Sequence, residues 1–411
     1  MKKYIALLLA IVLCLTVLAG CASQQAPDVS EPEDTAPEQT TPQEEAPAAD
    51  EAAEVQDVEL WYYWETESHQ ITLQAAIDAY NASQTAYKVT AKYVPFADFK
   101  KQLSIGAVAE ALPDMVILDS PDHASYASMG IFADITGKID VSSYFEGPVD
   151  SCTYDGKLYG VPFGVNCLAM FYNKDMLDEA GIEVPTTWSE LKDAAVKLSD
   201  GSRYGFAFCS VQNEEGTFNF MPWVWSAKSD YSTIGDENGV KALSFAKELI
   251  DSGAMSKECI NWTQGDVMNQ FISGNVAMMV NGCWQIPTMR SEAADLNWGV
   301  TLIPMCDDGE YASVIGGENY AVINVDGALD FLNYMTNEDV VVELMSGFGY
   351  IAGIESIAQN QFSGDEDYLK FVEQMTYAKA RGPHEDWPSI SDAISLAFNQ
   401  VMTGSAAPAD A

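Results

Sequence analysis

The chain has 411 residues, and its 61 Asp and Glu against 20 Lys and Arg give a formal net charge of −41. Hydrophobic residues make up 48% of it, which is too large a share for general disorder and is typical of a folded protein with an acidic surface. This charge argues against nucleic-acid partners, because nucleic-acid affinity rests on Lys and Arg that release counterions. The length exceeds what one hydrophobic core usually organises, so we expect at least two lobes.

The first residues have the features of a secretory signal. Lys2 and Lys3 precede an apolar run over residues 4–18, which ends in small residues before Cys21. This pattern predicts a signal peptide over residues 1–20, and no later stretch approaches the roughly 20 apolar residues that a bilayer crossing needs. The tetrapeptide Leu-Ala-Gly-Cys at 18–21 resembles the lipobox of bacterial lipoproteins. The resemblance implies that Cys21 is lipidated and anchors the protein to the outer face of the cell membrane; the alternative is an ordinary signal-peptide cysteine.

An acidic, proline-rich segment follows. Residues 21–56 place Pro27, Pro32, Pro37, Pro42 and Pro47 among acidic and small residues, without Lys or Arg. Such a segment cannot bury enough apolar area to offset its ordering entropy. We expect it to be a disordered tether.

The remaining cysteines leave several pairings open. They are Cys152, Cys167, Cys209, Cys259, Cys283 and Cys306. An exported protein can form disulfides, and six cysteines allow about 15 pairings, among which the sequence does not choose. No CxxC motif occurs, which argues against a zinc or redox site. A core of this size needs no cross-links, so we expect mostly free thiols.

The folded part shows alternating strand and helix patterns. Apolar residues alternate over 58–64 and 87–93, and 113–118 is a short apolar run typical of a buried strand. Helical spacing occupies 70–82 and about 96–109. This βαβαβ order predicts a largely parallel sheet covered by helices.

The same alternation continues to the end of the chain. Thr187 and Glu190 form a capping-box pattern before a helix. Further helices are expected after Asn238, Gln264, Asp326, Asp365 and Ser389, and strands at 158–161, 168–172, 204–208, 276–280, 298–303 and 320–323. The fold class is therefore α/β with two lobes, in which ligands bind beyond the carboxyl ends of strands.

Several segments resemble one known family. They are PDMVILDSPDHASYASMGIFADI at 113–135, YDGKLYGVPFGVNCLAMFYNK at 154–174, AGIEVPTTWSE at 180–190, FISGNVAMMVNGCW at 271–284, GGEN at 316–319, and the tail from GPHEDW at 382–387 to Gly404. These segments resemble extracellular solute-binding proteins of sugar ABC importers, the broad family that includes maltose-binding protein. The resemblance covers about residues 57–411.

The resemblance implies a periplasmic-binding-protein type II fold, whose two lobes close over a ligand in the cleft between them. We expect the chain to cross between lobes near 162–166, 313–317 and 349–353. The N-terminal lobe would then combine 57–164 with 315–350, and the C-terminal lobe 165–314 with 351–411.

Candidate ligand-binding residues follow from sugar chemistry and from this resemblance. Sugar hydroxyls need directional polar partners, and sugar C–H faces need flat apolar ones. The candidates are Trp64, Glu65, Thr66, Asp119, Asn166, Trp223, Trp225, Trp284, Gly317, Glu318, Asn319 and Trp387. Trp284 is the strongest candidate, and one of Trp223 and Trp225 is expected to face the cleft. Asp119 has the alternative role of a helix cap, which is also the role expected of Asp122.

The resemblance implies an extracytoplasmic receptor that captures a sugar or oligosaccharide by lobe closure and delivers it to the transmembrane subunits of an ABC permease, driven by their ATPase. We expect a monomer without cofactor, metal or enzymatic activity. No GxSxG or HExxH motif occurs, and His69, His123 and His384 lack metal-site spacing. The alternatives are a tethered glycosidase, which needs two opposed carboxylates, and a sugar sensor or adhesin. The identity of the sugar stays open.

Overall fold

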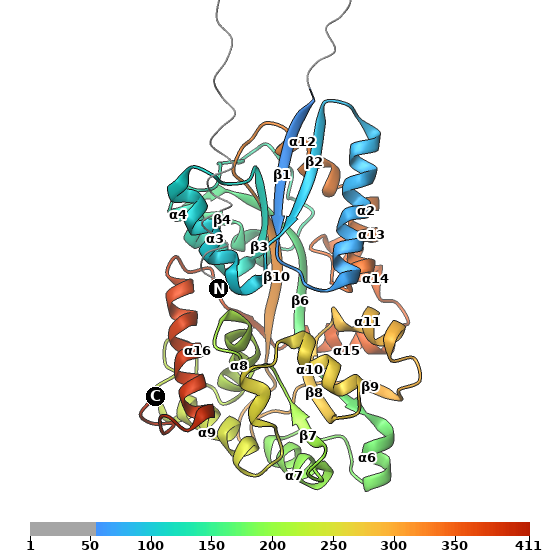
Figure 1. The fold of residues 1–411 in the computed structure, drawn as a ribbon, viewed down its shortest axis with the longest axis vertical. Coiled ribbons are helices and arrows are strands. Elements are labelled where there is room, and N and C mark those ends of the chain that lie inside the picture. Colours follow the sequence, from blue (N-terminus) through green and yellow to red (C-terminus); the bar gives the residue numbers. More distant parts are fainter. Residues whose placement is uncertain (1–54) are drawn as a thin grey trace, which may run out of the picture. The chain divides into compact units, whose positions relative to one another are not determined.

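The computed structural model describes residues 55–411 (Figure 1). The predicted signal peptide, Cys21 and nearly all of the predicted tether lie outside the described residues. Gln56, the last residue of that tether, already opens the first strand.

The strands are β1 (Gln56–Tyr62), β2 (Tyr87–Tyr93), β3 (Met115–Asp119), β4 (Thr153–Tyr154), β5 (Lys157–Leu158), β6 (Gly160–Asn173), β7 (Tyr204–Ala207), β8 (Val276–Gly282), β9 (Trp298–Thr301), β10 (Ser313–Val322) and β11 (Ala378–Ala380). The α-helices are α2 (Glu67–Ser83), α3 (Phe96–Ala109), α4 (His123–Ser128), α5 (Glu146–Ser151), α6 (Lys174–Ala180), α7 (Trp188–Leu198), α8 (Glu214–Ser226), α9 (Glu237–Asp251), α10 (Gln264–Ile272), α11 (Gln285–Glu292), α12 (Ala328–Met335), α13 (Glu338–Phe348), α14 (Glu355–Gln361), α15 (Glu366–Met375) and α16 (Trp387–Thr403).

Two lobes share one sheet. Among the described residues, a 9-stranded sheet has the order β2-β1-β3-β10-β6-β8-β7, with β11 beside β10 and β9 beside β6. We call the part built around β1, β2 and β3 the first lobe, and the part built around β7, β8 and β9 the second lobe. Figure 1 shows α2 and α13 on one flank of β1 and β2, and α3 and α4 on the other. Helix α16 packs against α8 and α9 in the second lobe.

The βαβαβ unit predicted at the start of the folded part is confirmed. Strand β1 pairs in parallel with β2 over its whole length, and with β3 on its other side. The observed bounds of β2 and α3 match the predicted 87–93 and 96–109. In α3 the buried residues Phe99, Leu103 and Gly106 lie at helical spacing on one face.

The centre of the sheet is not parallel, which corrects the expectation. Strand β10 runs antiparallel to both β3 and β6, and β6 runs antiparallel to β8. Strand β6 is also one continuous element where the sequence suggested two strands around a crossing. All of its residues except Tyr172 are buried, so apolar packing on both faces keeps it extended through the segment 162–166.

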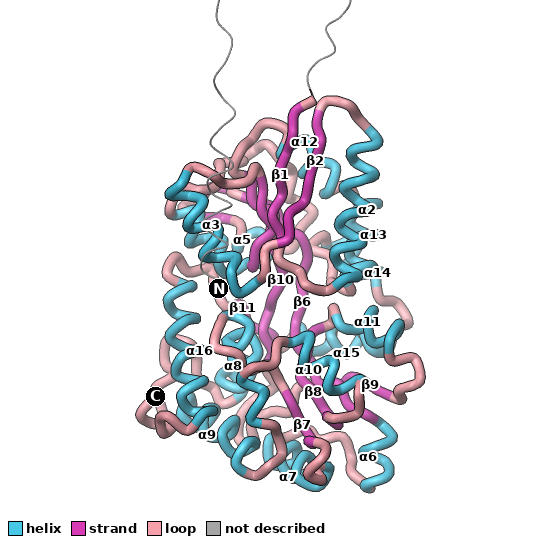
Figure 2. Tube along the Cα trace, in the orientation of Figure 1, coloured by secondary structure: helices cyan, strands magenta, loops and turns pink. Residues whose placement is uncertain are grey.

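Strands β6 and β10 connect the two lobes (Figure 2). Residues 160–167 of β6 pair with β10, with a register shift near Glu318, and residues 168–172 pair with β8 of the second lobe. In β10, residues 318–322 pair with β3, whereas residues 313–315 pair with β11. A third segment lies beside them, because Ile351 and Val165 exchange backbone hydrogen bonds of 2.8 and 2.9 Å.

Gly317 is required where these strands meet. It lies inside β10 with φ +132, and a Cβ there would stand 2.1 Å from the carbonyl oxygen of Gly164 in β6. Gly317 therefore allows two crossing strands to approach more closely than a side chain would permit.

The cysteines of the described part carry free thiols, and all of them are buried. No helix within residues 55–411 is long and apolar enough to span a membrane. That same part of the chain contains no group of three or more His, Cys, Asp or Glu placed to hold a metal ion.

Candidate ligand-binding site

A cavity of about 230 Å³ lies between residues of both lobes. Its walls come from the loop after β1, the ends of β3 and β8, the crossing strands β6 and β10, and the first turns of α8 and α10. Segments that follow strands thus form much of the cavity, as the rule for α/β sheets predicts.

Trp64 forms a fixed aromatic wall on the side of the first lobe. It follows β1, and its ring packs against Phe163 and Phe348 with centroid distances of 4.9 and 4.5 Å. Its Nε1 donates a hydrogen bond of 3.0 Å to Oε1 of Glu318. The indole is therefore held from behind by packing and by one directional bond.

Glu318, from β10, collects three hydrogen bonds on one oxygen. Its Oε1 accepts from Tyr63 Oη at 2.9 Å, Trp64 Nε1 at 3.0 Å and Tyr350 Oη at 2.9 Å. Its Oε2 is buried and has no hydrogen-bond partner. Burial, with a smaller contribution from the nearby Asp119 charge, raises the pKa of Glu318 to about 7. Oε2 is thus free to bond a ligand, as an acceptor when ionised and as a donor when protonated.

Trp284 contributes a second indole from the second lobe. It follows β8, and a Cβ on Gly282 would stand 2.0 Å from the Trp284 ring, so the indole lies directly over that glycine. Its ring centroid is 6.2 Å from that of Phe218 and 6.1 Å from that of Tyr350. Aromatic faces from both lobes therefore line one cavity.

Arg381 forms a buried ionic cluster at the same cavity. It follows β11, and its guanidinium donates two hydrogen bonds, of 2.7 and 2.8 Å, to the carboxylate of Asp119 at the end of β3. It also donates to Oε1 of Glu214 in the first turn of α8. Arg381 is only 3% exposed. The cluster joins the first lobe to the second. The Asp119 side chain bonds Arg381 and does not cap the following helix, which was its alternative role.

Lys100 of α3 extends this cluster. Its Nζ lies 3.1 Å from Oδ2 of Asp122 and 3.6 Å from Oε2 of Glu214. Asp122 was expected to cap a helix, but it makes no capping hydrogen bond. Burial raises the pKa of Asp122 to about 7, although Lys100 lowers it. The same Oε2 of Glu214 accepts a hydrogen bond of 3.0 Å from Trp387 Nε1.

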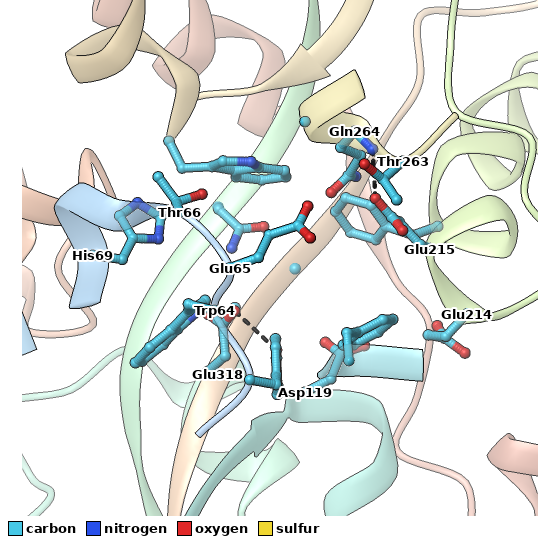
Figure 3. A pocket seen from close by; sticks show the side chains of 18 of the residues that line it. Trp64, Glu65, Thr66, His69, Asp119, Glu214, Glu215, Thr263, Gln264 and Glu318 are labelled. Atoms are coloured by element: carbon cyan, nitrogen blue, oxygen red, sulfur yellow. Dashed lines mark hydrogen bonds between the residues drawn. The ribbon is translucent and has the colours of Figure 1, made fainter. Parts of the chain in front are cut away.

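A second group of carboxylates faces the first turn of α10 (Figure 3). Oε1 of Glu215 accepts a hydrogen bond of 2.6 Å from the backbone N–H of Gln264, and Figure 3 shows the Glu65 carboxylate directed toward Thr263 and Glu215. Burial raises the pKa of Glu215 to about 7. Burial and the Asp266 charge also raise the pKa of Glu65. These carboxylates come from opposite lobes.

The cavity brings together most of the candidates that the sequence singled out. Those that line it are Trp64, Glu65, Thr66, Asp119, Asn166, Trp284, Gly317 and Glu318. Asn166 is 3% exposed, and its Oδ1 has no hydrogen-bond partner.

Trp223 and Trp225 do not line the cavity, so the prediction that one of them faces the cleft does not match the structure. Both are 1% exposed, because residues 216–226 of α8 are buried all round. Trp223 packs against Trp188 and Phe208, and Trp225 Nε1 bonds Asp230 at 3.1 Å.

Trp387 and Asn319 also lie away from this cavity. Trp387 is fully buried, and its indole N–H bonds Glu214, which does line the cavity. Asn319 Nδ2 donates to Ser151 Oγ at 2.9 Å, and Asn319 lines a smaller cavity of about 90 Å³. Successive side chains of a strand point to opposite faces, so Glu318 and Asn319 do not share one cavity.

A further set of residues that line the cavity was not predicted from the sequence. They are Tyr63, His69, Tyr93, Pro95, Phe96, Ala97, Asn213, Glu214, Glu215, Phe218, Thr263, Gln264, Gly265, Gln285, Gly316, Tyr350 and Arg381. Asn213 could have been predicted, because it is the N-cap of α8, the helix that follows β7, and ligands bind beyond the carboxyl ends of strands in this fold class. Thr263 is also a helix N-cap, but its helix does not follow a strand. No motif or spacing in the sequence around Arg381 or Tyr350 indicates that either residue lines a cavity.

Comparisons with known proteins identify the family of this chain. The family model described as bacterial extracellular solute-binding protein matches residues 75–369. The galactooligosaccharide-binding protein of Bacillus subtilis (strain 168) is 25% identical over 353 residues, which cover 81% of this chain and 83% of that protein.

Two solved structures are also similar. The GacH receptor of Streptomyces glaucescens GLA.O, described unliganded and in complex with acarbose, has 26% identity and a TM-score of 0.77, covering 87% of this chain and 96% of that one. The cyclic alpha-maltosyl-1,6-maltose binding protein of Arthrobacter globiformis has 28% identity and a TM-score of 0.70, with the same coverage of 87% and 96%. The chain therefore belongs to the family of bacterial extracellular solute-binding proteins.

Proposed function

We propose that this protein is an extracytoplasmic carbohydrate-binding receptor, which captures a sugar or oligosaccharide by lobe closure and delivers it to an ABC permease. One observation carries the proposal: Trp64 and Trp284, from opposite lobes, line one cavity that also presents two buried acceptors without partners, Glu318 Oε2 and Asn166 Oδ1. Apolar plates together with unmatched polar atoms fit a ligand that has C–H faces and hydroxyl groups.

The similar proteins support a sugar as the ligand. The Bacillus subtilis relative is a galactooligosaccharide-binding protein, and the Streptomyces receptor binds acarbose. We propose that Trp64 and Trp284 each cover a sugar face, contributing on the order of 1–3 kcal/mol by apolar burial. Glu65, Asn166 and Glu318 then bond hydroxyl groups, with Thr66 beside them. Asp119 acts mainly through Arg381, which occupies both of its oxygens.

Binding favours closure because only the closed form lets both lobes touch the ligand. A ligand shifts such an equilibrium by its difference in affinity for the two forms. We propose an N-terminal lobe of 57–164 plus 315–350 and a C-terminal lobe of 165–314 plus 351–411, with one refinement. Gly353 O accepts a hydrogen bond from Phe145 N, and Ile354 pairs with Tyr144 of the first lobe. The last crossing would then follow α14.

The family implies an extracytoplasmic location, and we propose the further details of attachment and partners. Cys21 would carry the lipid anchor on the outer face of the cell membrane. Stable anchoring takes more than one acyl chain, so intact-mass measurement of the mature protein should show a diacylglyceryl-sized addition at Cys21, which Cys21→Ala abolishes. The receptor would act as a monomer on the permease subunits. Light scattering of the purified chain tests the monomer.

A thermal-shift screen against a glycan panel tests the carbohydrate proposal. A ligand that binds only the native state raises the free energy of unfolding of the protein by about 2.7 kcal/mol when the ligand concentration is 100 times the Kd. We expect at least one neutral sugar to raise the melting temperature and to be recovered unchanged after incubation. Release of new reducing ends would favour a glycosidase. Stabilisation by amino acids or peptides, with no response to any glycan, would contradict a carbohydrate receptor.

A further inference from the structure

We propose that this cleft selects saccharides by charge: it accepts neutral and amine-bearing sugars and rejects uronic acids, with Glu65, Glu215 and Glu318 as the residues that set this preference. The inference rests on the proposed carbohydrate function and names the ligand class of the same site. Three features support it. The cation of the cavity is already paired, three carboxylates of the cavity have no counterion, and the buried polar atoms without hydrogen-bond partners include two acceptors.

The cation of the cavity is already neutralised. Among the described residues, Arg381 is the one Lys or Arg side chain that lines this cavity. Its guanidinium donates hydrogen bonds to both Asp119 and Glu214. Its Nε has no partner and could still donate to a hydroxyl group. However, Lys100 and Asp122 extend this cluster, so two cations face three carboxylates, and the cluster offers no net positive charge to an anionic sugar.

Three more carboxylates of the cavity have no cationic partner. Among the ion pairs within residues 55–411, none involves Glu65, Glu215 or Glu318. Glu318 is held by neutral phenol and indole donors, and Glu215 by a backbone N–H. An anionic ligand would bring a further negative charge close to these three, where like charges repel strongly at reduced dielectric.

The unmatched atoms of the cavity point to a ligand that donates hydrogen bonds. Glu318 Oε2 and Asn166 Oδ1 are buried acceptors without partners, and their residues are 5% and 3% exposed. A hydroxyl group can donate to such an atom, and an ammonium group donates only. An ionised carboxylate only accepts. Above the pKa of Glu318, about 7, a uronic acid that places its carboxylate here would therefore leave both acceptors unmatched, at a cost of about tenfold or more in affinity for each.

Matched sugar series test the selectivity. Calorimetry at pH 7.5 would measure Kd for mono-, di- and trisaccharides of glucose, galactose and mannose, together with their 2-amino and their uronic acid counterparts. In every series whose neutral member binds, we expect the uronic acid to bind at least about 10-fold more weakly, and the amine to bind as tightly as the neutral sugar or more tightly.

The variants Glu65→Gln, Glu215→Gln and Glu318→Gln test the residue assignment, since each removes one charge and keeps the shape. The ratio of the uronic acid Kd to the neutral sugar Kd should fall several-fold in each, and further in the triple variant. Glu179→Gln, at an exposed position of α6, changes the net charge equally and should leave the ratio as in the native chain. Circular dichroism confirms the fold of each variant.

The outcomes separate this inference from the function on which it rests. A uronic acid that binds the native protein as tightly as its neutral counterpart overturns the charge selection and leaves a carbohydrate receptor. A ratio that none of the three variants changes overturns the assignment to these residues. Failure of every sugar to bind overturns the proposed function, and the inference with it.

Discussion

Replacing Arg381 by Met should strongly destabilise the folded protein. Asp119 and Glu214 are only 8% and 3% exposed, and Arg381 is the cation that bonds both. Glu214 would keep Lys100 at 3.6 Å and the Trp387 indole N–H at 3.0 Å. Asp119 would lose the guanidinium that bonds both of its oxygens.

The expected loss follows from leaving one buried carboxylate without its counterion. Removing one partner of a buried ion pair typically costs about 3–5 kcal/mol, and Asp119 is the group most affected. Urea unfolding at pH 7, followed by far-ultraviolet circular dichroism, measures the loss as a lower midpoint at similar slope.

Two further variants make the measurement specific. Lys379→Met removes a neighbouring cation whose pair with Glu310 is about half exposed on both sides, so it should cost no more than about 1 kcal/mol. Adding Asp119→Asn to Arg381→Met should restore part of the stability, because the unpaired buried charge is then removed. If Arg381→Met lies within about 1 kcal/mol of the native chain, the reasoning about this cluster is wrong.

Three other changes should have separate effects. Trp284→Ala should weaken binding of the sugar found in the panel by about 10- to 100-fold, from roughly 1–3 kcal/mol of lost apolar contact, with an unchanged circular dichroism spectrum; an unchanged Kd would remove Trp284 from the site. The pKa of Glu318 is raised from 4.5 to about 7, so the folded state holds a proton there that the unfolded state releases between these values. Its contribution to stability is therefore present below about pH 4.5 and lost as the pH rises to about 7, and the unfolding free energy of Glu318→Gln, measured in urea from pH 4.5 to 8, should fall less steeply over this window than that of the native chain. Equal slopes would contradict the assignment. Gly317→Ala should lower the free energy of unfolding by at least about 2 kcal/mol, since its Cβ would stand 2.1 Å from the carbonyl oxygen of Gly164. The control Gly147→Ala, with nothing within 4 Å of its Cβ, should change it by no more than about 1 kcal/mol in the same urea assay.

Local patterns were enough to predict the first half of the first lobe. Strand β2 and helix α3 have the predicted bounds, because alternating and helical apolar spacing each leave one buried face. Helix α7 begins after the predicted cap, since the Thr187 side chain accepts a hydrogen bond from the Glu190 N–H. Trp284 could be placed at the cavity for a similar reason, as it lies two residues after the end of an apolar strand.

The same local patterns misplaced residues whose role depends on distant partners. An aromatic run such as Trp223 to Trp225 fits a cavity wall and a hydrophobic core equally well, so its sequence does not distinguish between the two. The packing of α8 against α9 and α16 decides that both rings are buried. Likewise, the adjacent Glu318 and Asn319 face different cavities because β10 alternates its side chains.

The sequence alone determined the α/β class, the positions of most helices and strands, and the aromatic and acidic residues available to a site, because these depend on side-chain periods of a few residues. Only the tertiary structure decided the antiparallel crossing strands β6 and β10 and the cluster around Arg381. Its partners Asp119 and Glu214 lie 262 and 167 residues away along the chain, and no local pattern records which distant charges folding brings within bonding distance.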